Sequence, residues 1–107
     1  MFNYHFRRFK KKEGAKHNAS KHPKLIVDEK SDQYGYMGLT KSRKRGHHNN
    51  IPLKKNPQKG NTVQSYIRNE LRYDLKSAFE DVLPDYRLSR EDADMITKHL
   101  LEKRKKK

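Results

Sequence analysis

The chain has 107 residues, of which 27 are lysine or arginine and 13 are aspartate or glutamate, so its formal net charge is +14. It contains no cysteine, which excludes disulfides and thiolate metal sites and fits a reducing, cytoplasmic location. The longest apolar run, 25–27, is far too short to cross a membrane, and we therefore expect no membrane partner.

The distribution of charge predicts one small domain with basic ends. Residues 1–21 hold a single acid among many bases, and we expect this arm to be disordered because it has too little apolar surface to bury. Residues 103–107 are all lysine or arginine and form a basic tail, which we likewise expect to be disordered. The segment 22–102 is left to form a single small α+β domain, with a short, mostly antiparallel sheet and a C-terminal helix.

Two short strand patterns separated by polar residues predict a β-hairpin over 24–40. Alternation places Tyr34, Tyr36 and Gly38 on one side of the second strand. Gly35 and Gly38 favour a close backbone approach or a bulge at this strand.

A basic loop at 41–50 is followed by a third short strand. Ile51 and Leu53 share one face of this strand, and Pro52 predicts that it lies at an edge of the sheet because proline cannot donate a ladder hydrogen bond. Several breakers at 56–61 then predict a turn.

The segment 62–82 supports two interpretations. Alternation over 66–73, with Ile67, Leu71 and Tyr73 on one face, is typical of a strand. Apolar residues that recur every fourth position from Val63 are typical of a helix, and the sequence pattern alone leaves the choice open.

The C-terminal helix has clear start signals. Ser89 and Asp92 match a capping box, and acids in the first turn suit the positive end of a helix. Ala93, Ile96 and Leu100 then form one apolar stripe.

The basic segment 33–69 predicts nucleic acid as the partner. It has eight lysines and arginines and no acid, together with aromatic and amide side chains. Aromatic strand residues suit unpaired bases and favour RNA slightly over DNA, and limited base contact predicts modest sequence specificity. The predicted nucleic-acid-binding residues are Tyr34, Tyr36, Lys41, Arg43, Lys44, Arg45, His47, His48, Lys54, Lys55, Lys59 and Arg68.

A metal-independent, toxin-like ribonuclease is the enzymatic alternative. Such an enzyme needs a base for the 2′-hydroxyl proton, an acid for the leaving oxygen and cations for the phosphorane. The candidate catalytic residues are His22, Thr40, His48, Tyr66 and Arg68. No carboxylate accompanies His47 and His48 within 33–69, and no glycine-rich phosphate loop is present, so we expect no metal and no cofactor.

Two further alternatives are a structural role and an adaptor role, neither of which requires catalysis. The chain can be a ribosome-associated protein whose tails order on RNA, or a phage or mobile-element adaptor that binds an acidic protein. The segment 70–102 holds nine acids against five bases and is the candidate surface for a protein partner.

Four short motifs follow one another in the chain: His22-Pro-x-Leu-Ile-Val, Tyr34-x-Tyr-x-Gly-Leu-Thr, Ile51-x-Leu-x-Lys-Asn-Pro and Tyr66-Ile-Arg. In this order the chain resembles small, mostly uncharacterised basic proteins of Gram-positive bacteria, phages and mobile elements, over 22–85. More distantly, it resembles the compact ribonuclease toxins of the barnase, colicin and RelE type. That second resemblance implies that His22, Thr40 and Arg68 face one cleft and that 65–73 is a strand. The chain departs from this second resemblance at the residue after Thr40, which is Lys41; a histidine there would be stronger evidence for acid–base catalysis.

Overall fold

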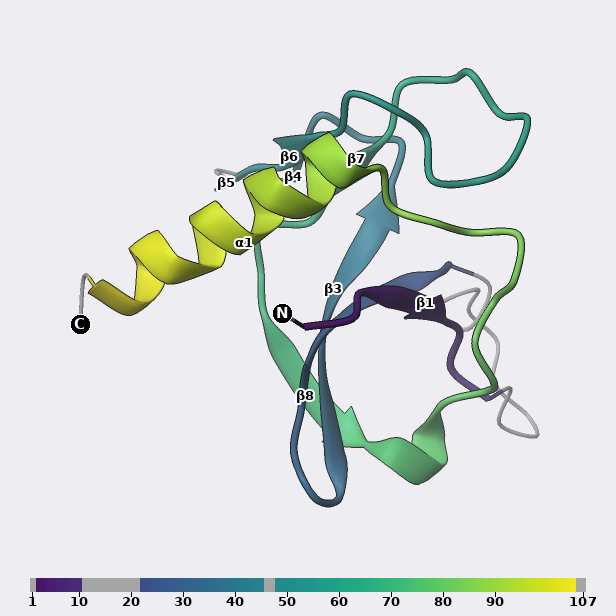
Figure 1. Ribbon diagram of the computed structural model, residues 1–107, viewed down its shortest axis with the longest axis vertical. Coiled ribbons are helices and arrows are strands. Elements are labelled where there is room, and N and C mark those ends of the chain that lie inside the picture. The colour runs from purple at the N-terminus through teal and green to yellow at the C-terminus, as the bar shows by residue number, and fades with distance from the viewer. Residues whose placement is uncertain (1, 11–21, 46–47, 106–107) are drawn as a thin grey trace.

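The computed structural model describes residues 2–10, 22–45 and 48–105 (Figure 1). It has a mostly antiparallel six-stranded sheet and one C-terminal helix, which confirms the predicted α+β class. The sheet has the order β1-β2-β3-β7-β6, β8 pairs with β3, and β4 and β5 form a separate two-stranded hairpin. The elements are β1 (His5–Arg7), β2 (Lys24–Glu29), β3 (Gln33–Thr40), β4 (Lys44–Arg45), β5 (His48–Asn49), β6 (Ile51–Pro52), β7 (Tyr66–Ile67), β8 (Arg72–Leu75), a 3-10 turn (Lys76–Ala78) and α1 (Arg90–Lys105).

The predicted hairpin is formed by β2 and β3. These strands pair antiparallel, and the register shifts between Ile26 and Asp28, as expected for a bulge beside a glycine-containing strand. A Cβ added to Gly35 would lie 2.8 Å from Tyr73 Cε2 and 2.9 Å from Asp28 Cβ, so glycine permits this close approach. The predicted role of Gly35 is therefore confirmed.

Hydrophobic side chains gather on both faces of β2, which explains its uninterrupted apolar run. One cluster includes Leu25, Val27, Met37 and Ile67, and Ile96 from α1 belongs to it. The other cluster lies on the opposite face and contains Ile26, Tyr36 and Phe79.

The prediction of a disordered arm over 1–21 is wrong for residues 2–10. Strand β1 pairs with β2, and Phe6 is completely buried in the first cluster. Phe9 forms an isolated bridge with Phe79 and packs against its ring. Aromatic side chains spaced among the bases supply the apolar surface that the charge-based prediction overlooked. Residues 11–21 lie outside the described residues.

The ambiguous segment 62–82 forms two short strands rather than a helix or one continuous strand. Both β7 and β8 pair with the same edge of β3, and the chain bends between them. Ile67 is buried, whereas Val63 and Leu75 of the alternative helical stripe are more than half exposed. Pairing with β3 therefore decided the conformation here.

Strand β6 lies at the end of the sheet order beside β7, as its proline predicted. Ile51 and Leu53 are buried on one face and Pro52 is exposed, which confirms the predicted edge strand.

Helix α1 crosses the sheet end that contains β6 and β7 (Figure 1). Ser89 Oγ accepts the backbone N–H of Asp92 at 3.2 Å, which is one half of the predicted capping box. In a full capping box the Asp92 carboxylate would accept the backbone N–H of Ser89. Here that carboxylate is buried and instead accepts the backbone N–H groups of Lys54 and Lys55 at 2.9 and 3.1 Å. The helix continues to Lys105, so the tail predicted to begin at residue 103 is helical as far as it is described. Within the described residues no helix is long and apolar enough to cross a membrane.

Candidate nucleic-acid interface

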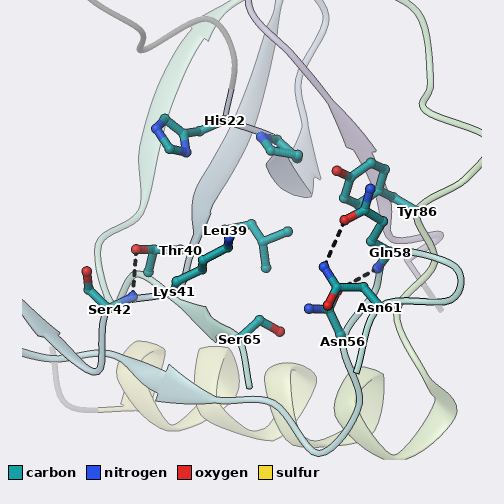
Figure 2. Close-up of a pocket in the computed structure, with 11 residues that line it drawn as sticks. His22, Leu39, Thr40, Lys41, Ser42, Asn56, Gln58, Asn61, Ser65 and Tyr86 are labelled. Atoms are coloured by element: carbon teal, nitrogen blue, oxygen red, sulfur yellow. Dashed lines mark hydrogen bonds between the residues drawn. The ribbon is translucent and has the colours of Figure 1, made fainter. Parts of the chain in front are cut away.

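A pocket of about 340 Å³ opens where β2 begins and β3 ends; we call it the His22 pocket (Figure 2). Its lining residues are His22, Pro23, Leu39, Thr40, Lys41, Ser42, Asn56, Gln58, Asn61, Ser65 and Tyr86. Segments far apart in the sequence therefore meet here: the start of β2, the end of β3, the loop after β6 and the connection before α1. None of these described lining residues is acidic, and the pocket is consequently suited to an anionic or carbonyl-rich ligand.

Three polar side chains predicted from the sequence converge on this pocket. His22 is exposed at its rim, and Thr40 and Lys41 follow one another at the end of β3 (Figure 2). Thr40 Oγ1 accepts the backbone N–H of Ser42 at 3.1 Å, which holds the hydroxyl and leaves its proton available for donation. A potential base, a hydroxyl donor and a cation thus surround the same space.

Ser65 contributes a buried hydroxyl to the pocket. The residue is 3% exposed, and its Oγ has no hydrogen-bond partner among the described residues. An unpaired buried hydroxyl is costly, so a group that enters the pocket gains by bonding to it. Nothing in the local sequence around Ser65 indicates this role, because it depends on the long-range packing of the loop after β6.

The loop 56–63 is fixed by side-chain amides. Asn56 Oδ1 accepts the backbone N–H of Gln58 at 2.9 Å, and Asn61 Oδ1 accepts that of Val63 at 2.9 Å. Asn61 Nδ2 donates to Gln58 Oε1 at 3.0 Å. Such side-chain turns hold the backbone in place, which gives the pocket a rigid wall.

Two further cations lie on the face of the sheet that carries Gly38 and Thr40. Lys24 is opposite Gly38 in the β2–β3 register, and the Arg68 side chain crosses over Gly38, where an added Cβ would lie 3.3 Å from Arg68 Cδ. Burial, and secondly the positive charge of Arg68, lower the pKa of Lys24. An anion bound near Lys24 would favour its charged form and so oppose both effects.

The exposed cations between residues 41 and 59 differ in their ion pairing. Lys41, Arg43 and Lys44 are exposed, and no carboxylate in the described part of the chain lies within salt-bridge distance of them. Lys54 instead pairs with Glu91 at 3.1 Å, although both side chains remain largely exposed. Lys55 and Lys59, on the loop after β6, are exposed as well.

The prediction that the strand tyrosines contact unpaired bases is not supported at Tyr36. Its ring is 8% exposed and packs edge-on against Phe9 and Phe79, and its hydroxyl donates to Asp74 at 2.9 Å. Tyr34 is half-buried and packs edge-on against the same Phe79 ring. The tyrosine rings on this face of β3 pack into the protein, because β2 and β3 carry apolar side chains on both faces and both faces must be buried.

The other predicted site residues have different positions. Tyr66 is half-buried on β7 opposite Thr40, and neither Tyr66 nor Arg68 lines the pocket. Arg45 and His48 belong to the hairpin β4–β5. His47 lies outside the described residues. Lys24, Gln58, Ser65 and Tyr86 were not among the predicted residues.

No family model, curated protein or solved structure matches the chain. Within the described residues, no three histidine, aspartate or glutamate side chains lie close enough together to hold a metal ion. Inferences about function therefore depend on the His22 pocket and the cations around it.

Proposed function

We propose that the protein binds RNA, with the His22 pocket and its neighbouring cations as the contact surface. The observation that carries this proposal is a pocket without acidic lining residues that includes Lys41 and is followed in the chain by the exposed bases Arg43 and Lys44, none of which forms an ion pair among the described residues. Lys41, Arg43 and Lys44 would bind successive phosphates, and the backbone contacts would supply most of the affinity.

Lys24 and Arg68 extend this surface along the sheet. Two cations held side by side in a partly buried position favour an anion between them, and a phosphate has the required charge. They share a face of the sheet with Thr40, which also lines the pocket.

Helix α1 is unsuited to reading duplex DNA. Its first turn carries Glu91 and Asp92, and Asp92 is buried against the loop after β6. A recognition helix instead presents its N-terminal residues to the major groove. A concave pocket of hydroxyl and amide groups suits the splayed bases of single-stranded RNA.

Binding can be tested by fluorescence anisotropy with single-stranded RNA, duplex RNA and duplex DNA between 50 and 300 mM salt. We expect single-stranded RNA to bind most tightly, with affinity falling steeply as salt increases. The Lys41→Ala/Arg43→Ala/Lys44→Ala variant should reduce the slope of log K against log salt by about 2, since each phosphate contact contributes about 0.7 for single strands. The matched control changes Arg87, Arg90 and Lys98, which are equally exposed bases of the C-terminal segment. Equal losses in the two triple variants would overturn the proposed surface.

A metal-independent ribonuclease is a second candidate, because His22, Thr40 and Lys41 line one pocket. Neutral His22 would accept the 2′-hydroxyl proton as the 2′-oxygen attacks phosphorus. The bond from phosphorus to the 5′-oxygen would break, and the leaving oxygen would take a proton from the imidazolium or from water. The products would be a 2′,3′-cyclic phosphate and a 5′-hydroxyl. Thr40 and Lys41 would stabilise the charge on the phosphorane.

Cleavage has its own test, which uses RNA incubated with protein and chelator and a denaturing gel. His22→Gln should slow cleavage by about a hundredfold or more while RNA affinity changes little. Thr40→Ser keeps the hydroxyl and Thr40→Val removes it, so only the latter should reduce the rate strongly. Intact RNA after long incubation with the wild-type protein would exclude the ribonuclease and leave RNA binding in place.

A further inference from the structure

We propose that the protein forms a symmetric dimer in which the outer edge of β8 pairs with the same edge of a second copy. The two strands would run antiparallel, with Tyr73 directly opposite the partner's Tyr73. This inference goes beyond RNA binding and does not depend on it. It gives the segment 70–102, the candidate surface for a protein contact, a specific partner.

Strand β8 has an open edge. In the described part of the chain it pairs with β3 alone, so its other edge borders no further strand (Figure 1). The chain that follows β8 leads away from that edge, because Phe79 forms a bridge with Phe9, next to β1 at the far end of the sheet. The edge of a strand is a ready template for pairing with another chain.

The ladder with β3 sets the direction of the backbone groups in β8. The backbone N–H of Lys76 donates to the carbonyl of Asp32 across this pair at 2.9 Å. Because backbone direction alternates along a strand, the other even-numbered residues of β8 also face β3. The odd-numbered residues from Leu71 to Leu75 therefore direct their N–H and C=O groups to the outer edge.

The sequence around Tyr73 is self-complementary when it is paired with itself antiparallel. It reads Glu70-Leu-Arg-Tyr-Asp-Leu-Lys76. With Tyr73 on the two-fold axis, Arg72 lies opposite the partner's Asp74, and Glu70 lies opposite the partner's Lys76. Symmetry repeats each pair, and opposite charges directly across an antiparallel ladder stabilise it.

The neighbouring registers bring like charges together. With the axis at Arg72, this residue would face its own copy and Glu70 would face Asp74. With the axis at Asp74, that carboxylate would face its own copy and Arg72 would face Lys76. Of these three registers, only the one centred on Tyr73 pairs opposite charges, so the charges select it.

Both central charged groups can take a further bond. Arg72 donates from Nε and Nη2 to Glu70 Oε1 at 3.0 and 2.8 Å, and Asp74 Oδ2 accepts from the Tyr36 hydroxyl at 2.9 Å. A guanidinium has five N–H donors and a carboxylate has about four lone-pair sites. Both residues are exposed, and their side chains can therefore reach a partner.

Two exposed leucines occupy the other face of the same segment. Leu71 is 39% exposed and Leu75 is 52% exposed, and they are two of the five large hydrophobic side chains exposed in the described residues. In the Tyr73 register, each leucine lies directly opposite the partner's other leucine. Pairing would thus remove apolar surface from water on one face while charges pair on the other.

Sedimentation velocity of the full-length protein, free of nucleic acid, tests the dimer. Concentrations should run from about 5 μM to about 1 mM, because a short strand pairing makes a small interface and a weak complex. About 300 mM salt is needed to screen the repulsion between two copies of net charge +14. We expect the sedimentation coefficient to rise from the monomer towards the dimer value, and a monomer at every concentration would overturn the proposal.

Two charge-reversed variants test the register. Arg72→Glu and Asp74→Lys each place like charges opposite one another at both symmetric positions, and each should weaken self-association by about tenfold or more. An equimolar mixture of the two restores opposite charges and should associate about as well as the wild type, which a loss of folding could not explain. Arg87→Glu, at an exposed position outside β8, is the charge control. A mixture no more associated than its components would overturn the proposal.

Leu75→Pro tests the backbone pairing itself. The φ angle of Leu75 is −60°, which suits proline, and its N–H is directed to the outer edge rather than to β3. The variant should therefore unfold at a similar temperature but remain monomeric, and undiminished association would overturn the proposal. Its RNA affinity should persist, because no pocket residue is changed, so loss of the dimer and loss of RNA binding are separate results.

Discussion

Lys24 and Arg68 share one face of the sheet at Gly38: Lys24 is opposite Gly38 in the β2–β3 register, and the Arg68 side chain passes over Gly38. Burial and this neighbouring positive charge together lower the pKa of Lys24 below that of a free lysine. Bringing like charges together during folding lowers the stability of the protein. Destabilising arrangements of this kind are common at functional sites, here one that would bind an anion.

Lys24→Met should therefore stabilise the free protein and weaken RNA binding. In the wild type, the unfolded chain keeps the Lys24 proton up to the ordinary pKa of 10.5, whereas the folded chain loses it at lower pH. The destabilisation is consequently complete at neutral pH and disappears as the pH rises through that window. Urea unfolding at pH 7 should show a gain of less than about 1 kcal/mol, because the group is only partly buried. Lys98→Met is the exposed control, and lower stability of Lys24→Met would contradict this explanation.

Gly35→Ala tests the close approach of β8 to the β2–β3 hairpin. The new methyl group would lie 2.8 Å from the Tyr73 ring and 2.9 Å from Asp28 Cβ, so either the ring or the strand must move. Overpacking of this kind costs about 1–3 kcal/mol, and thermal unfolding should show a lower Tm. Gly38→Ala is the matched comparison, since it meets the flexible Arg68 side chain at 3.3 Å and should cost less. Equal losses for the two glycines would argue against a tight contact at Gly35.

Asp92→Ala should be strongly destabilising. It removes the acceptor of the Lys54 and Lys55 backbone N–H groups, and these donors would be left unpaired where the start of α1 covers the loop. We expect a loss of about 2–4 kcal/mol in the free energy of unfolding. Asp92→Asn retains one acceptor oxygen and should lose less. Asp94→Ala, at an exposed position of the same turn, should change stability by no more than about 0.5 kcal/mol.

Tyr36 should ionise well above the ordinary pKa of tyrosine. Burial, and then the hydrogen bond to Asp74, raise the pKa of Tyr36 to about 12. Since the folded state keeps this proton after the unfolded state has lost it at about 10, the stability that Tyr36 contributes decreases as the pH rises from 10 to 12. Alkaline titration followed by tyrosinate absorbance should show a late step that is missing in Tyr36→Phe. A wild-type titration without that step would show that Tyr36 is open to solvent.

Local patterns in the sequence predicted the elements whose partners are near in the chain. The β2–β3 hairpin, the edge position of Pro52 and the Ser89 cap all follow from short-range signals. Strand β1 was missed because Phe6 is surrounded by bases, and its burial depends on β2, far along the chain. The choice between strand and helix at 62–82 likewise depended on the free edge of β3.

The candidate site was only partly predictable for the same reason. The resemblance implies that His22, Thr40 and Arg68 face one cleft; the first two line the His22 pocket, whereas Arg68 does not line it and lies over Gly38. Gln58 and Ser65 come from the loop after β6, where their residue types are common. Their importance depends on packing and on hydrogen bonds that the sequence does not reveal.

RNA binding at the His22 pocket can be tested directly by an NMR titration of the labelled full-length protein with a single-stranded RNA octamer carrying 2′-O-methyl groups. Binding there should shift the amide signals of Lys24, Thr40–Lys44 and Ser65–Arg68, and the side-chain amide signal of Gln58, with smaller effects at higher salt. The outward face of α1, including Glu102, should be unaffected. Shifts concentrated in 70–105, or none at any RNA concentration, would contradict the proposed function.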